Sequence, residues 1–189
     1  RLVGQITVDD VMDEVREQSE RDYQLASGLS QDVETDDNVF RQTTARLPWL
    51  IIGMLGGIGN SMILGNFDAT FAAHPEMALY IPLIGGTGGN VGTQSSALIV
   101  QGLANSSLDS KNTLKQVAKE AVVALINATI ISLLVYTYNF IRFGAMATVT
   151  YSVSISLFAV VMFASIFGTL VPMTLERLKI DPAIATGPF

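Results

Sequence analysis

Hydrophobic and polar residues are separated along this chain into a charged N-terminal part and a long apolar body. Four stretches of the body carry no charged residue: 47–67, 77–108, 121–141 and 143–175. A helix of roughly 20 residues crosses the hydrocarbon core of a bilayer, so each stretch is long enough to span it. A fifth span is expected to begin at Asp181. The pattern predicts an all-α, polytopic membrane bundle with five spans, at about 47–67, 77–104, 121–141, 150–175 and, incompletely, 182–189.

The polar N-terminal part has its own order of elements. Residues 2–8 (LVGQITV) predict a short strand, and the two aspartates that follow can cap a helix over about 11–25. Residues 26–38 have the composition of a linker, and a second helix is expected to begin near Val39 and lead into the first span. We therefore divide the chain into a cytosolic element, a linker with an approaching helix, and a transmembrane domain, at residues 1–25, 26–46 and 47–189.

The distribution of charged residues supports this division into a polar N-terminal part and an apolar body. Hydrophobic residues make up 49% of the chain, charged residues only 15%, and the net charge is −6. A soluble domain carries about a quarter charged residues. Eleven of the seventeen acidic residues lie in residues 1–46, whereas the apolar body is neutral. An acidic chain without a basic stripe excludes nucleic acid as an expected partner, and the partner of the apolar body is the lipid bilayer.

The distribution of Lys and Arg predicts the orientation in the membrane. Positive charges concentrate in the loops that face the cytoplasm. With a cytoplasmic N-terminus, seven basic residues of the segments from 41 onward fall on the inner side and only Arg142 on the outer side. We expect a multi-pass protein of the cell membrane with this orientation.

A glycine-rich segment, 85–94 (GGTGGNVGTQ), lies inside the second predicted span. Glycine destabilises a helix by about 1 kcal/mol relative to alanine, so a cluster in a span needs a reason. One interpretation is close packing of helices, which small residues permit and which we assign to Gly56, Gly57 and Gly59 of the first span. The other is a helix interrupted at mid-bilayer, whose carbonyls line a pore with the oxygens of Asn90, Thr93 and Gln94.

The side chains of the segment limit which metal ions it could bind. Neither histidine nor cysteine lies near it, which disfavours zinc and copper. Neutral oxygens suit an ion that keeps its water, and Mg²⁺ dehydrates reluctantly. The uncharged spans contain no carboxylate, and the nearest candidates to offset the divalent charge are Glu176 and Asp181.

Two segments of the body resemble the signature of the MgtE family of magnesium channels. They are 82–104 (PLIGGTGGNVGTQSSALIVQGLA) and 170–189 (LVPMTLERLKIDPAIATGPF). Residues 46–49 (RLPW) resemble the entry to that family's first membrane helix, and 2–13 (LVGQITVDDVMD) resemble the end of a CBS domain followed by a connecting plug helix.

The resemblance implies a homodimer with a pore on the dimer axis that conducts hydrated Mg²⁺. Carried over, the ion site comprises Gly86, Gly89, Asn90 and Thr93, supported by Gln94, Gly85 and Gly88. Asp181 is then expected as a further metal-site residue at the inner mouth, where its charge concentrates cations. The family's principal pore aspartate is expected a few residues beyond Phe189.

The same resemblance implies that cytosolic Mg²⁺ closes the pore through the acidic N-terminal helix. Crowded carboxylates repel each other unless cations screen them. A solvated acidic helix is the alternative, and the segment 16–22 (REQSERD) departs from the family's more continuously acidic pattern. The expected sensor residues are Asp9, Asp10, Glu17, Glu20 and Asp22.

The sequence therefore predicts a Mg²⁺-selective, channel-like transporter that is not an enzyme and needs only Mg²⁺. The alternative within transport is a broader divalent carrier that admits Co²⁺ or Mn²⁺. An intramembrane hydrolase is disfavoured because Ser95 and Ser96 have no visible base in the spans. A non-transporting regulatory membrane protein is a further alternative.

Overall fold

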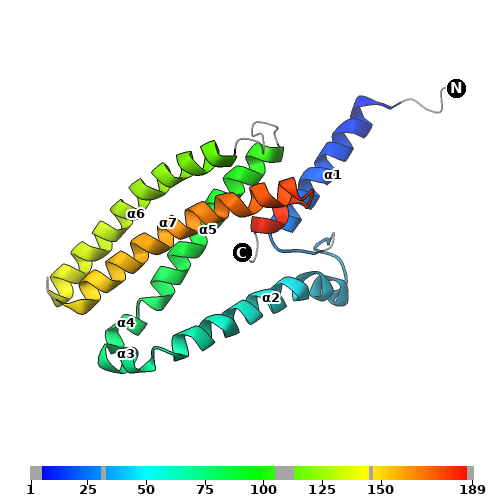
Figure 1. The fold of residues 1–189 in the computed structure, drawn as a ribbon. Helices are drawn as coiled ribbons and strands as arrows, with labels where there is room; N and C mark the ends of the chain where they lie inside the picture. The colour runs from blue at the N-terminus through cyan, green and yellow to red at the C-terminus, as the bar shows by residue number, and fades with distance from the viewer. Residues whose placement is uncertain (1–5, 31–32, 105–112, 145–146, 187–189) are drawn as a thin grey trace.

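The computed structural model describes residues 6–30, 33–104, 113–144 and 147–186 (Figure 1). These residues form helices and no strands, as expected for an all-α membrane protein. Their elements are α1 (Val8–Ala26), α2 (Val39–Gly65), α3 (Asp68–Ala73), α4 (Pro75–Ala78), α5 (Ile81–Ala104), α6 (Thr113–Phe143), α7 (Thr148–Arg177) and the 3₁₀ helix η2 (Pro182–Thr186).

A three-helix bundle of α5, α6 and α7 forms the centre of the molecule (Figure 1). The helix α7 packs along both α5 and α6, and it holds most of the buried residues. Ala128 of α6 meets Leu157 and Val161 of α7 in the apolar core. Fully buried Ser165 and Thr169 also lie on α7. Small and hydroxyl-bearing residues at helix contacts are typical of packing in membranes.

The first predicted span lies apart from this bundle over most of its length (Figure 1). Near its C-terminal end, Asn60 and Leu64 line a cavity with Ile84. Most large apolar side chains of α2 between Leu50 and Ile63 are exposed. A helix of this composition suits lipid or another protein surface. Among the described residues, α2, α6 and α7 are long and apolar enough to cross a membrane. The helix α5 has 24 residues but is less apolar.

The expected second span is divided in the structure. A short helix, α4, ends at Ala78, and α5 begins at Ile81. The fifth span, expected at 182–189, is represented by η2, and residues 187–189 lie outside the described ranges.

The N-terminal helix is longer than the prediction, and its cap differs. We expected a strand at 2–8, but Ile6 and Thr7 are irregular and Val8 already belongs to α1; residues 2–5 lie outside the described part. Thr7 caps the helix rather than the expected aspartate pair. Its hydroxyl accepts a bond from the Asp10 N–H while the Asp10 carboxylate accepts from the Thr7 N–H, which is a capping box.

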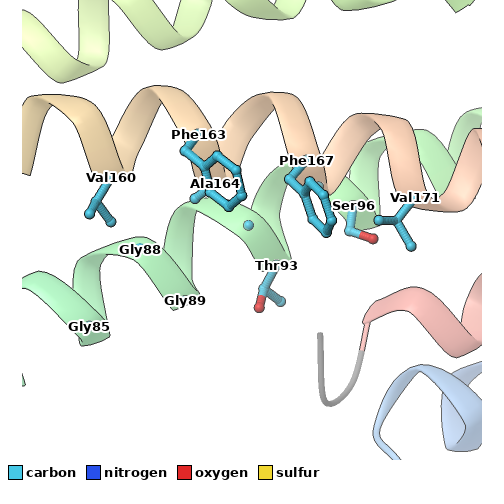
Figure 2. Close-up of a pocket in the computed structure, with 12 residues that line it drawn as sticks. Gly85, Gly88, Gly89, Thr93, Ser96, Val160, Phe163, Ala164, Phe167 and Val171 are labelled. Atoms are coloured by element: carbon cyan, nitrogen blue, oxygen red, sulfur yellow. The ribbon is translucent and has the colours of Figure 1, made fainter. Parts of the chain in front are cut away.

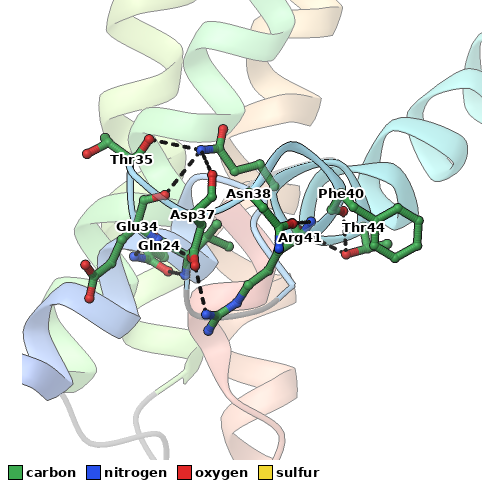
Figure 3. Close-up of polar contacts among 10 residues, drawn as sticks. Gln24, Glu34, Thr35, Asp37, Asn38, Phe40, Arg41 and Thr44 are labelled. Carbon is green, nitrogen blue, oxygen red and sulfur yellow. Dashed lines mark hydrogen bonds and ion pairs between the residues drawn. The ribbon is translucent and has the colours of Figure 1, made fainter.

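The described part of the linker between α1 and α2, residues 27–30 and 33–38, is hydrogen-bonded to both helices, and we call it the connector (Figure 3). The Gln24 amide donates to the Val33 carbonyl at 3.0 Å and accepts from the Val33 N–H at 3.1 Å. From α2, the Gln42 amide donates to three backbone carbonyls, those of Glu34, Thr35 and Asp37. Within 33–42, a segment predicted as linker thus folds back on the start of α2.

A second contact ties the connector to α2. The Ser30 N–H and hydroxyl donate to the Ala45 carbonyl at 3.0 and 2.9 Å, and Ala45 is fully buried. Gly28 adopts a positive φ of 79°, which ends α1 and turns the chain against Trp49. The position of α1 is therefore linked to the first span through backbone contacts.

Candidate ion-binding face of α5

The glycine-rich segment is a continuous part of α5 in the structure. The expectation of a helix interrupted at mid-bilayer is wrong for this chain. Helical hydrogen bonds engage the backbone carbonyls along the axis, so the glycines do not present them as a broken loop does. What the glycines change is the shape of the helix surface.

Two glycines of the segment pack closely against α7. A Cβ on Gly88 would lie 2.6 Å from Cγ1 of Val160, and a Cβ on Gly168 would lie 2.5 Å from the carbonyl oxygen of Gly92. Val160 points from α7 toward Gly88 in Figure 2. The packing interpretation therefore holds for Gly88 and Gly92.

Other glycines of the segment face open space. A Cβ on Gly85, Gly86 or Gly89 would meet no atom within 4 Å. The packing of this chain alone gives no reason for glycine at these positions. The same holds for Gly56, Gly57 and Gly59 of α2, which we expected to pack against another helix.

The remaining candidates of α5 share one exposed face, whereas Gly88 and Ser95, which pack against α7, are buried. At about 100° per residue, positions 86, 89, 90 and 93 fall on one side of the helix. We call this set the α5 stripe; it comprises Gly86, Gly89, Asn90 and Thr93. Gln94 is exposed at its edge. The structure thus places the predicted ion-site residues of α5 together.

A pocket of about 250 Å³ borders the stripe between α5 and α7 (Figure 2). Gly89 and Thr93 line it from α5, and the stacked rings of Phe163 and Phe167, 5.2 Å apart, line it from α7. The buried Ser96 hydroxyl also lines it and has no hydrogen-bond partner among the described residues. Since liquid water takes about 30 Å³ per molecule, the pocket can hold several waters.

Asp181 lies apart from the stripe, on the turn before η2. Its side chain is exposed, and its Oδ1 accepts a bond from the Ala183 N–H at 2.9 Å, so it caps η2. The helix η2 packs against α5, α7 and α1. The carboxylate therefore stands where the ends of these elements meet.

A carboxylate that the sequence interpretation missed lies inside the bundle. Glu120 belongs to α6, and its Oε1 accepts hydrogen bonds from the Ser95 hydroxyl at 2.7 Å and from the Ser165 hydroxyl. The two hydroxyl oxygens are 3.1 Å apart. Both conclusions drawn from the absence of such a group, that the spans hold no carboxylate and that Ser95 has no base, are corrected here.

The error has a local cause. Glu120 directly precedes the third uncharged stretch and follows Lys119, so it falls outside the span predicted at 121–141. In the structure α6 begins at Thr113, and Glu120 is already two turns inside the helix. A helical reading that began earlier would have placed Glu120 on the α6 face that carries Ala124 and Ala128.

The expected sensor residues lie on the exposed helix α1, and several have partners on the same helix. Arg16 pairs with Glu20 at 3.0 Å, and Arg21 pairs with Glu17 at 2.9 Å. The Gln18 amide donates to Asp22 at 2.7 Å. Exposed i,i+4 pairs of this kind stabilise a helix weakly.

The capping residue Asp10 differs from the other acids of α1. Hydrogen bonds from the Thr7 side chain and backbone lower the pKa of Asp10. Within the described ranges, no three His, Cys, Asp or Glu side chains gather closely enough to hold one metal ion.

The chain is similar in sequence to known proteins. The sequence model of the MgtE family, described as a divalent cation transporter, matches residues 81–189. The magnesium transporter MgtE of Thermus thermophilus is 33% identical over 195 residues, and that of Bacillus subtilis is 31% identical over 188 residues. Each match covers the whole chain but only 42% of the relative. The chain thus spans about two fifths of the length of these relatives.

Proposed function

The chain belongs to the MgtE family, and from this membership we propose that it contributes the ion path of a Mg²⁺ transporter. The observation that carries the proposal is the α5 stripe, an exposed row of glycines and neutral oxygens on a helix of a membrane bundle. Both relatives are named as magnesium transporters, which supports Mg²⁺ as the ion.

The stripe suits an ion that retains its water. Asn90 and Thr93 offer amide and hydroxyl oxygens, which bind coordinated water without stripping it from Mg²⁺. Gly86 and Gly89 leave room for the hydration shell because no side chain projects from them. Polar side chains that face outward from a membrane helix are costly unless they meet water or a partner. A water-filled path along the stripe meets that requirement.

One chain supplies only one wall of such a path. We infer that a second copy faces the first across the stripe, so that a homodimer encloses the pore on its axis. The open space at Gly85, Gly86 and Gly89 supports this arrangement, since it leaves room for a partner helix as well as for water. Exposed apolar residues along α2 offer further surface for lipid or for the partner.

Asp181 is proposed to act at the inner mouth of this path. Its exposed carboxylate lies on the turn between α7 and η2, and η2 packs against α5. A carboxylate at a pore mouth raises the local concentration of cations. Gln94, at the edge of the stripe, is proposed to support the ion site rather than to contact the ion.

The N-terminal region is proposed to lie in the cytoplasm and to close the pore when Mg²⁺ is abundant. Residues 1–25 then form the end of a regulatory domain of the CBS type and the start of the plug helix, and residues 26–46 complete the link to the first span. The connector supports such a role because it is hydrogen-bonded to both helices, to α1 through Gln24 and to α2 through Ser30 and Gln42. The positive-inside pattern of Lys and Arg supports the orientation.

A broader divalent carrier is the second candidate. The description of the family as a divalent cation transporter favours it. Co²⁺ and Mn²⁺ would then compete with Mg²⁺ for uptake at comparable concentrations. A Mg²⁺-selective channel would show little competition, because a site for the hydrated ion discriminates by the size and strength of the hydration shell.

The decisive experiment replaces Asn90 by leucine in the full-length protein reconstituted in liposomes. Asn90→Leu should reduce Mg²⁺ flux by more than tenfold while the protein still assembles, since it removes the amide from the stripe. The matched control is Asn127→Leu, the same exchange at an exposed position of α6. Unchanged flux in Asn90→Leu would remove the stripe from the ion path.

A further inference from the structure

Glu120 joins all three helices of the bundle at one point. Its Oε1 is held by the hydroxyls of Ser95 on α5 and Ser165 on α7. Both serines are almost fully buried, at 4% and 2% exposure, and their oxygens lie 3.1 Å apart. Three polar side chains from three helices thus share one hydrogen-bonded cluster, which we call the Glu120 clamp.

The clamp lies beside the closest approach of α5 and α7. A Cβ on Gly168 would meet the Gly92 carbonyl oxygen at 2.5 Å and Cβ of Ser95 at 3.2 Å. The glycines bring the two backbones together, and this approach places Ser95 and Ser165 within reach of the same carboxylate oxygen. The close crossing of α5 and α7 and the hydrogen bonds from the two serines to Glu120 therefore depend on each other.

The surroundings of Glu120 can accommodate a polar side chain inside the bundle. A cavity of about 550 Å³ between α5 and α6 is lined by Glu120, Lys119, Gln94 and Gln116. Lys119 contributes a basic residue to the lining and Glu120 an acidic one, beside the two glutamines. A carboxylate in a membrane helix is tolerated when it faces a polar cavity and accepts hydrogen bonds.

Ser95 and the α5 stripe lie on opposite sides of one helix. Asn90 precedes Ser95 by five residues, and Thr93 precedes it by two, which separates them from Ser95 by about 140° and 160° around the axis. A bond that holds Ser95 against α6 and α7 therefore turns Asn90 and Thr93 outward. Rotation of α5 by one residue, about 100° around its axis, would turn the stripe away from its present exposed side.

We propose that Glu120 is a positioning residue that fixes the rotation of α5 and so presents the stripe to the ion path. This inference rests on the proposed function for its effect on transport. Its structural part, the orientation of α5, holds independently of which ion is carried. Glu120 itself does not contact the ion.

The first test measures transport by the full-length protein in liposomes. Glu120→Ala removes the acceptor and should lower Mg²⁺ flux per folded molecule at least tenfold and change the ratio of Mn²⁺ to Mg²⁺ flux. Glu120→Gln keeps an oxygen that can accept both hydroxyls and should restore most of the flux and the wild-type ratio. The control Glu76→Ala removes a carboxylate from α4 whose partner, His74 at 3.4 Å, lies outside the three bundle helices.

The pattern across variants separates positioning from other roles. The double variant Ser95→Ala/Ser165→Ala should resemble Glu120→Ala, and combining all three changes should add little further loss. Glu120→Ala with lower thermal stability but unchanged flux and ion ratio would overturn the proposal in favour of a stability role. Equal loss in Glu120→Gln and Glu120→Ala would overturn it in favour of a role for the charge.

The second test does not depend on transport. The chain contains no cysteine, so single cysteines can be labelled cleanly. In the clamped protein Asn90→Cys should react quickly with a charged thiol reagent and Val91→Cys slowly, because Val91 is partly buried. Adding Glu120→Ala should reduce the difference between the two rates at least threefold. An unchanged difference would overturn the proposal even if the protein transports Mg²⁺, and a reduced one would support it even if Mg²⁺ flux were absent.

Discussion

Gly168 of α7 faces Gly92 of α5 so closely that a Cβ on Gly168 would lie 2.5 Å from the Gly92 carbonyl oxygen. Real Cβ atoms essentially never approach a backbone oxygen to this distance. The two helices therefore cross with their backbones in contact, as small residues permit in membranes. This crossing fixes α5 in the bundle and leaves its opposite side, with the stripe, exposed.

Gly168→Ala should destabilise the bundle by about 1–3 kcal/mol, the usual range for overpacking a close contact. The clashing atom is a backbone oxygen, so relief requires the helices to move apart. Thermal denaturation of the detergent-solubilised protein measures the effect. Gly85→Ala is the matched control, because a Cβ there meets nothing within 4 Å. Equal stability of the two variants would show that the crossing is looser than described.

Gly88→Ala should behave differently, although its clash is almost as close. The added Cβ would lie 2.6 Å from Cγ1 of Val160, which is a side chain. We expect Gly88→Ala to destabilise the protein and Val160→Ala in the same chain to restore much of the loss. The same melting experiment tests this, with Gly168→Ala/Val160→Ala as the combination that should show no rescue. Failure of the rescue would place the strain of Gly88→Ala in the backbone.

The sequence predicted the helical bundle well because long uncharged stretches have few other solutions in a membrane. It failed on the conformation of α5. Glycine is compatible with both a broken helix and a tight crossing, and the outcome depends on α7, which supplies Val160 and Gly168 more than 70 residues away in the sequence. Local patterns do not contain that information.

The candidate site was predictable only where its residues lie on a single helix. The spacing of Gly86, Asn90 and Thr93 places them on one face of any continuous helix, and all three are exposed on α5. Their contact with an ion stays a prediction. The Glu120 clamp was missed because its members come from three helices. Serine in a span has an ordinary explanation within its own helix, so nothing in its local sequence identifies a distant partner.

The connector offers a test of the link between α1 and α2. Gln42→Leu removes the amide that donates to the Glu34, Thr35 and Asp37 carbonyls, so these carbonyls lose a shared donor. We expect amide hydrogen exchange over residues 33–38 to become at least tenfold faster. The control is Gln18→Leu, whose amide bonds only Asp22 on the exposed face of α1. Equal exchange in the two variants would show that Gln42 does not hold the connector.

The acids of α1 can be tested for Mg²⁺ sensing without damage to the helix cap. We expect Asp9→Asn/Glu17→Gln/Glu20→Gln/Asp22→Asn to weaken closure of the full-length protein at high Mg²⁺, because fewer carboxylates remain to be bridged or screened. Asp10 is kept because it closes the capping box with Thr7. Flux measured against internal Mg²⁺ reports the effect. A closure curve identical to that of the wild type would place the sensor elsewhere.

The control for the sensing experiment uses acids outside α1. Glu34→Gln/Asp36→Asn removes two exposed carboxylates from the connector and should leave the Mg²⁺ dependence of closure in place. A shift of equal size in this variant would indicate that total negative charge, rather than α1, sets the response.

The start of α1 should also depend on pH through Asp10. The Thr7 hydroxyl donates to Asp10 Oδ2 at 2.6 Å and the Thr7 N–H at 2.8 Å, and these bonds hold the pKa of Asp10 below its ordinary value of 3.8. Because the folded pKa is the lower one, the cap stabilises α1 fully above about 3.8 and loses this contribution as the pH falls through the lowered pKa. Exchange protection of residues 8–11, corrected for intrinsic rates, should fall in that window. In Asp10→Asn the same residues should be less protected at neutral pH and show no further loss in acid, whereas a similar acid step in that variant would assign the step to another carboxylate.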